Sequence, residues 1–208
     1  MSETGDNVPP SNLENPTLIT NPKDGITFHP SAFVVVESQL GTLDTKTLSS
    51  QLEFILAAKP SFTLGDLTIN VAGTFSKKTY SIGGNIPTAT NSLSLDPINF
   101  TIGGVTKILS PALQVVGDVD TGTWSGSVSL SAADFRTLFS SPTMQISEMR
   151  INSTATVSAT AKYATATSYL TDMSFVVTAI PEPTSFALLG ISSLVPFLLR
   201  KKLNLKRK

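Results

Sequence analysis

Apolar and small polar residues alternate along most of the chain between residues 31 and 180. In the clearest stretch, residues 67–75, the apolar positions are Leu67, Ile69, Val71 and Phe75. A period of two places one set of side chains on each face of an extended strand. The same pattern continues at 124–130 and 155–163, and it predicts that Tyr169, Met173, Phe175 and Val177 share one buried face. Most of the polar positions are Ser or Thr, which are compatible with half-buried strands.

Turn-forming residues such as Gly83-Gly84-Asn85 and Asp120-Thr121-Gly122 separate these stretches. The strands predicted in this way lie at about 32–38, 51–58, 62–64, 67–76, 78–82, 93–101, 113–119, 123–130, 144–151, 154–164 and 168–179. One short helix is expected at 132–140, with Ser131 as its N-cap and Asp134 completing a capping box. We therefore predict an all-β body, an antiparallel β-sandwich or jelly roll, carrying one short helix.

The C-terminal segment has a different pattern. Pro181-Glu182-Pro183 precedes residues 184–199, TSFALLGISSLVPFLL, which contain no charged side chain. As a helix these 16 residues would span about 24 Å, and flanking Lys and Arg can snorkel to span a hydrocarbon core of about 30 Å. A basic cluster follows: Arg200, Lys201, Lys202, Lys206, Arg207 and Lys208. An apolar segment followed by a basic cluster predicts a single transmembrane helix with its basic end on the cytoplasmic side. The alternative is a buried core helix followed by a basic coil.

Charge and composition narrow the function classes. The chain has 208 residues, 15 basic and 15 acidic side chains, one His and no Cys. Six of the 15 bases lie in the last nine positions, so the remainder carries nine bases against 15 acids. This balance argues against a globally basic nucleic-acid binder. The absence of Cys excludes a disulfide scaffold and a Cys nucleophile, and a single His excludes a multi-His metal centre; no cofactor is expected.

The order of residues 181–208 resembles the PEP-CTERM sorting signal of exported bacterial proteins. The resemblance implies recognition of Pro181, Glu182 and Pro183 by an exosortase-type processing enzyme, with the basic cluster acting as a stop-transfer signal. It also implies passage through the inner membrane and delivery to the cell surface or the extracellular matrix. Such proteins share this signal and differ widely in the body, so the resemblance indicates sorting and no molecular activity.

Residues 1–30 are rich in Pro, Asn and Thr, and we expect them to form a flexible N-terminal segment before a body at 31–180. They contain neither the basic n-region nor the apolar h-region of a signal peptide. This leaves open a tail-anchored membrane protein whose body is a cytoplasmic binding module.

No residue pattern specifies catalysis. The single imidazole, His29, lies in the polar N-terminal segment, so a hydrolytic triad is not expected. A secreted polysaccharide-active enzyme would need a pair of carboxylates, and the candidates are Glu37, Glu53, Asp66, Asp118, Asp120 and Glu148. Asp118 and Asp120 also form a weak calcium candidate, against a hairpin turn joining 113–119 to 123–130.

Aromatic residues are candidates for binding exopolysaccharide. Trp124 is in phase with core positions, so we expect it to be buried, whereas Tyr80 beside Lys77 and Lys78 is the better exposed candidate. The sequence therefore favours an exported cell-surface or matrix protein of structural or adhesive type, with the tail-anchored module and the secreted enzyme as alternatives.

Overall fold

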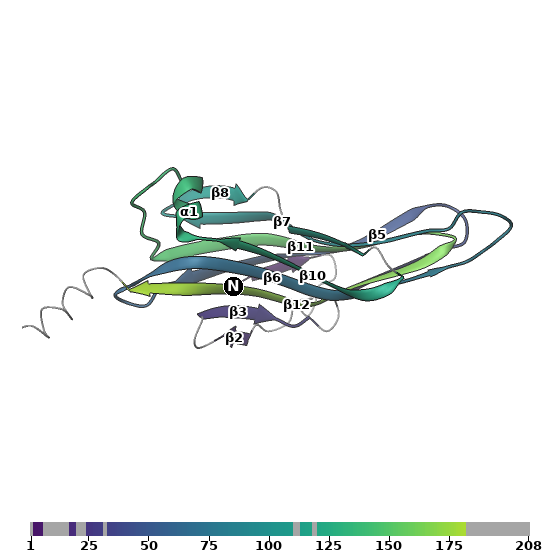
Figure 1. The fold of residues 1–208 in the computed structure, drawn as a ribbon, viewed down its shortest axis with the longest axis horizontal. Coiled ribbons are helices and arrows are strands. Elements are labelled where there is room, and N and C mark those ends of the chain that lie inside the picture. The colour runs from purple at the N-terminus through teal and green to yellow at the C-terminus, as the bar shows by residue number, and fades with distance from the viewer. Residues whose placement is uncertain are drawn as a thin grey trace, which may run out of the picture.

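The computed structural model describes residues 2–5, 17–19, 24–30, 33–109, 113–117 and 120–181. These residues form two six-stranded antiparallel sheets and one short helix (Figure 1). The first sheet has the order β1 (Ser2–Gly5), β5 (Asp44–Ala57), β11 (Glu148–Lys162), β7 (Thr88–Ile102) and β8 (Val105–Leu109), and β9 (Leu113–Gly117) also pairs with β7. The second has the order β10 (Thr121–Leu130), β6 (Phe62–Thr79), β12 (Ala164–Pro181), β3 (Asp24–Phe28) and β2 (Thr17–Ile19), and β4 (Val34–Gln39) also pairs with β12. The predicted all-β, sandwich-like body is confirmed for this part of the chain.

The central strands are long, and they give the molecule an elongated shape (Figure 1). Strands β6 and β12 have 18 residues each and would span roughly 60 Å. The sequence predicted three shorter strands over the range of β6. Strand β6 instead continues through Gly65-Asp66, where its register with β12 shifts. At this irregularity the Asp66 amide donates to the hydroxyl of Thr178.

One core lies between the sheets, and its side chains become smaller toward one end. In the middle, Phe54 contacts Phe28 and Phe175 with ring centroids 6.3 and 4.8 Å apart. Toward the turn between β11 and β12 the buried residues are alanines: Ala159, Ala161, Ala164 and Ala166. Small side chains let the two sheets approach each other there, so the sandwich tapers toward this turn.

Polar groups join the two sheets where the core is narrow. The Ser168 hydroxyl of β12 is 2.6 Å from the Ser158 carbonyl oxygen of β11 and 3.2 Å from the Asn91 side-chain oxygen of β7. The Asn91 amide in turn donates to the Ser76 carbonyl oxygen of β6 at 3.2 Å. Asn91 and Ser168 are both buried, and these bonds satisfy their polar groups.

The predicted alternation holds along β6, where Leu67, Ile69, Val71 and Phe75 are buried, and fails within β12. Tyr169 is 40% exposed, whereas Leu170 is 1% exposed. The cause is a β-bulge: Leu170 pairs with Gly73 and Asp172 with Ala72, so Thr171 has no partner on β6. One extra residue reverses the face on which later side chains lie, and the expectation that Tyr169 shares the face of Met173 was wrong.

Two further expectations need correction. Strands β9 and β10 do not form a hairpin, because β9 pairs with β7 in one sheet and β10 pairs with β6 in the other. Turn-forming residues such as Asp-Thr-Gly indicate that the chain changes direction. They do not show whether the next strand pairs with the previous one in a hairpin or joins the other sheet. The N-terminal 30 residues, expected to be flexible, contain β1, β2 and β3, and Ile26 and Phe28 of β3 are buried in the core.

The predicted helix is present as α1 (Ala132–Leu138). The Ser131 hydroxyl accepts a hydrogen bond from the Asp134 amide, and the Asp134 carboxylate accepts from the Ser131 amide, so the capping box is confirmed. Hydrogen bonds from the backbone and then the side chain of Ser131 lower the pKa of Asp134. Phe135 is fully buried against Phe100, while Leu138 and Phe139 are partly buried.

Within the described ranges, no helix has the length and apolar character that crossing a bilayer requires. The predicted membrane helix at 184–199 lies outside them.

Candidate functional site

The first residue of the predicted sorting motif lies at the end of the last strand. Pro181 is the final residue of β12 and pairs with Phe62 at the start of β6. It lines a pocket of about 120 Å³ together with Ile180, Thr63 and Arg136 of α1. The chain therefore leaves the body at the end of the sandwich that carries α1 (Figure 1). Glu182, Pro183 and the basic cluster lie outside the described residues.

The candidate catalytic carboxylates that lie on described strands are not brought together. Glu37, Glu53, Asp66 and Glu148 lie on four different strands, β4, β5, β6 and β11. Glu53 binds Arg150 at 2.8 Å, and Asp66 accepts a hydrogen bond from the Ala132 amide at 3.0 Å. Glu53 and Glu148 lie on neighbouring strands, but their register places them four residues apart along the strand direction, or about 13 Å. That separation exceeds the range for paired carboxylates in glycoside hydrolysis.

The weak calcium candidate is only partly visible. Asp120 is exposed immediately before β10, and its backbone carbonyl oxygen accepts a hydrogen bond from the Lys77 amide. Asp118 lies outside the described residues. In the described part of the chain, no three acidic or His side chains gather as a metal site would require.

The single imidazole lies beside a carboxylate. His29 follows β3, and its Nδ1 atom is 2.6 Å from Oδ1 of Asp172 on β12. Both side chains are about half exposed, at 60% and 50%. Thr171 donates a hydrogen bond to the other Asp172 oxygen at 3.1 Å. Acyl transfer would need a nucleophile hydrogen-bonded to the other ring nitrogen, Nε2, and the hydrogen bond that the described residues give His29 is the one at Nδ1 to Asp172.

Trp124 belongs to the core, as expected. It is 4% exposed and packs on Phe75 with ring centroids 5.3 Å apart. Its indole nitrogen donates to the Tyr169 carbonyl oxygen at 3.0 Å. Gly73 lies opposite, where a Cβ atom would collide with the Trp124 ring and with that same oxygen. Trp124 is therefore inaccessible to a carbohydrate ligand.

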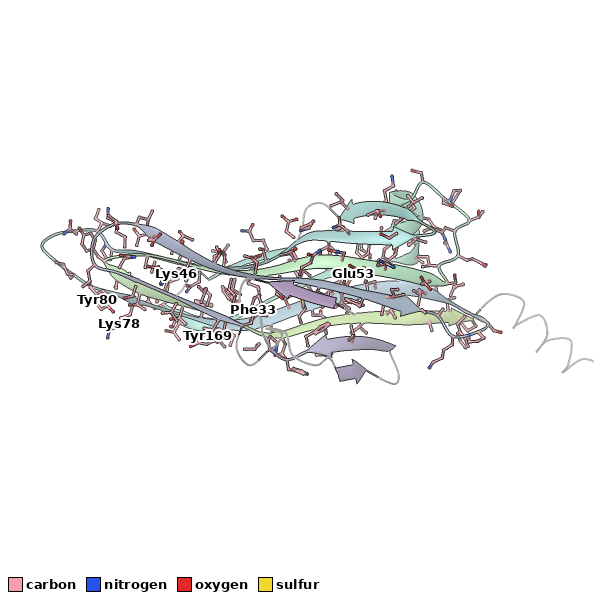
Figure 2. All side chains as sticks on the ribbon, turned by 180° about the vertical axis from the view of Figure 1, so that it is seen from behind. Phe33, Lys46, Glu53, Lys78, Tyr80 and Tyr169 are labelled. Carbon is pink, nitrogen blue, oxygen red and sulfur yellow. The ribbon has the colours of Figure 1, made fainter. Side chains whose placement is uncertain are left out.

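A charged residue is buried near the narrow end. Glu37 of β4 is 1% exposed, yet its carboxylate has two partners. The Gln39 amide donates to one oxygen at 2.7 Å, and the Lys46 ammonium lies 3.3 Å from the other. Lys46, labelled in Figure 2, is itself 62% exposed, so the pair reaches from the core to the surface.

Three connections meet at the narrow end of the sandwich, and we call this end the tip. It consists of residues 40–43 between β4 and β5, residues 80–87 between β6 and β7, and Tyr163 between β11 and β12. Its exposed large aliphatic side chains are Leu40, Leu43, Ile82 and Ile86, which are 67%, 58%, 42% and 83% exposed. The tip lies at the opposite end of the molecule from Pro181 (Figure 1).

Sequence reasoning missed the tip, because its parts are separated by long stretches of chain. One signal was present: aliphatic Ile82 and Ile86 flank Gly83-Gly84-Asn85, where a solvent-exposed turn would ordinarily carry polar residues. Tyr80, the expected exposed aromatic, lies at the tip and is half-buried, with its hydroxyl 2.9 Å from that of Thr165.

Comparisons with known proteins add no relative. No family model matches the sequence, and no curated protein is similar to it.

Proposed function

We propose that the chain is an exported bacterial cell-surface or matrix protein of structural or adhesive type, sorted through residues 181–208. The observation that carries the proposal is the order of Pro181-Glu182-Pro183, an uncharged apolar segment and a basic cluster. An apolar segment enters a bilayer readily, and a cluster of Lys and Arg resists crossing it. Cleavage near the motif would release the body on the outer side.

The fold is compatible with this role. Pro181 ends β12 at one end of the sandwich, so a processing enzyme would approach the motif at the end of the body's last strand. The body extends away from that point, and the tip lies at its far end. Before cleavage, a protein held in the membrane through the segment after Pro181 would therefore present the tip outward, as an adhesive or spacer function requires.

The test is the mass of the exported protein. The full chain, carrying a secretion leader, is produced in a bacterium that has an exosortase and in a strain from which the exosortase is deleted. We expect a product ending near residues 181–183 in the first strain and an uncleaved product in the second. Recovery of surface protein that retains residues 200–208 in both strains would contradict the proposal.

A matched pair of variants distinguishes loss of recognition of the motif from a general effect of substitution on folding. Replacing Pro181, Glu182 and Pro183 together by Ala should leave the chain uncleaved. The control Glu148→Ala changes an exposed glutamate at the start of β11 and should be processed normally. Protease added to intact cells distinguishes the exported protein from the tail-anchored alternative. A body exposed at the cell surface would be digested, whereas a cytoplasmic body would survive the treatment.

A further inference from the structure

The topology places the three connections of the tip side by side. In the second sheet, Ala164 pairs with Gln39 on one side and with Thr79 on the other. In the first sheet, Ala161 pairs with Asp44 and with Ala89 in the same manner. Each connection crosses from one sheet to the other, with Tyr163 between the other two. Residues 40–43 and 80–87 are therefore separated by about two strand spacings, roughly 10 Å.

This arrangement brings exposed apolar side chains from separate connections together at the tip. One exposed Leu or Ile on a soluble protein needs no explanation. Leu40, Leu43, Ile82 and Ile86 instead project from neighbouring connections at one end of the molecule, and each exposes more than two fifths of its surface. Grouped apolar side chains of this kind mark an interaction site.

The surroundings of the patch indicate what it contacts. The Lys78 ammonium lies 5.9 Å from the centre of the Tyr80 ring, and the Lys162 ammonium lies 5.8 Å from that of Tyr163. Neither lysine has an ion-pair partner within the described residues. Proteins enter the boundary between lipid headgroups and acyl chains with exposed aliphatic side chains that have Tyr and Lys close by, and the tip has both.

Charge complementarity favours an anionic surface. Residues 39–44, 78–88 and 162–164 contain Lys78 and Lys162 against one carboxylate, Asp44. Deeper in the sandwich, Lys46 is paired with Glu37, so these two residues add no net charge. The Lys77 amide donates to the Asp120 carbonyl oxygen, which places one basic and one acidic residue side by side on β6 and before β10. The strand ends next to the tip thus carry two lysines against one carboxylate, although the chain before its basic tail is acidic overall.

We propose that the tip docks on an anionic lipid bilayer, with the four aliphatic side chains entering the interface and Lys78 and Lys162 contacting the headgroups. Each lysine near an anionic surface strengthens binding, and the effect weakens as salt rises. The tip would dock in this way whether or not the C-terminal segment is processed, so its failure and the failure of the sorting proposal are separable.

Residues 184–208 would themselves bind vesicles, so total binding does not test the tip. The experiment therefore measures the environment of the tip with a dye attached there. The chain has no Cys, so Ile86→Cys in the full chain carries a single environment-sensitive dye at the tip. The control is Ile108→Cys on β8, which is 59% exposed and lies toward the α1 end. Vesicles are phosphatidylcholine alone or phosphatidylcholine with an equal part of phosphatidylglycerol, with or without a lipid-borne quencher.

We expect a blue shift and quenching for the dye at position 86, only with anionic vesicles, and no response at position 108. We expect two double variants to weaken vesicle binding, read from the dye at position 86, about tenfold or more each: Leu40→Ser with Leu43→Ser, and Lys78→Gln with Lys162→Gln. The control Val105→Ser should leave binding unchanged. Unfolding midpoints check that each variant folds. The proposal would be overturned if the dye at position 86 gave no response, or if the dyes at 86 and 108 responded equally. It would also be overturned by equal responses to the two kinds of vesicle, or by a response to a soluble anionic polysaccharide in place of vesicles.

Discussion

At the scale of single residues, the contact between Gly73 and Trp124 determines how β6 and β10 pack. Gly73→Ala would place a methyl group against the Trp124 ring and the Tyr169 carbonyl oxygen, where backbone and indole have little freedom to move. We expect a loss of about 1–3 kcal/mol in the free energy of unfolding, measured in urea. Gly41→Ala is the matched control, because nothing lies within 4 Å of its added Cβ, and it should leave stability nearly unchanged.

The capping box of α1 gives a second prediction at this scale. The pKa of Asp134 is lowered first by the Ser131 backbone amide and then by the Ser131 hydroxyl. Ser131→Ala keeps the amide, so the pKa of Asp134 should rise only part of the way to its ordinary value, as an NMR titration would show. Because the folded pKa is depressed, the ionised carboxylate stabilises the fold above the pKa of the unfolded chain's Asp, and this contribution is lost as pH falls through the lower, folded pKa. An unchanged pKa in Ser131→Ala would contradict the observed hydroxyl bond.

At the scale of elements, the bulge at Thr171 decides which face of β12 is buried. Leu170→Ala should cost about 2–4 kcal/mol, since Leu170 is buried beside Gly73. Tyr169→Ala should cost less than about 1 kcal/mol, because that side chain is 40% exposed and its carbonyl bond to Trp124 remains. Equilibrium unfolding in urea measures both changes. The opposite order of the two losses would mean that the strand runs in the regular phase, without the bulge.

The elements that the sequence predicted are those specified by local chemistry. The buried positions Leu67, Ile69 and Val71 follow from alternation, and the start of α1 follows from the reciprocal bonds of Ser131 and Asp134. The features that it did not predict depend on pairing over long distances. The phase change at Thr171, the crossover between β9 and β10 and the convergence of residues 40–43 with 80–87 each require knowledge of which strands are neighbours. Local periodicity carries no such information.

At the scale of the whole molecule, an elongated body separates two regions that we propose to be lipid-binding. Pro181 and the tip lie at opposite ends, roughly 60 Å apart along β12. A full chain whose C-terminal segment is inserted in one vesicle would therefore hold its tip beyond that bilayer, free to dock on another. We expect the full chain to cluster anionic vesicles, seen as a rise in light scattering. Leu40→Ser/Leu43→Ser should abolish clustering while the protein still sediments with vesicles through its tail, and Val105→Ser should cluster as the unmodified chain does. Clustering that survives loss of Leu40 and Leu43 would place the second contact elsewhere than at the tip.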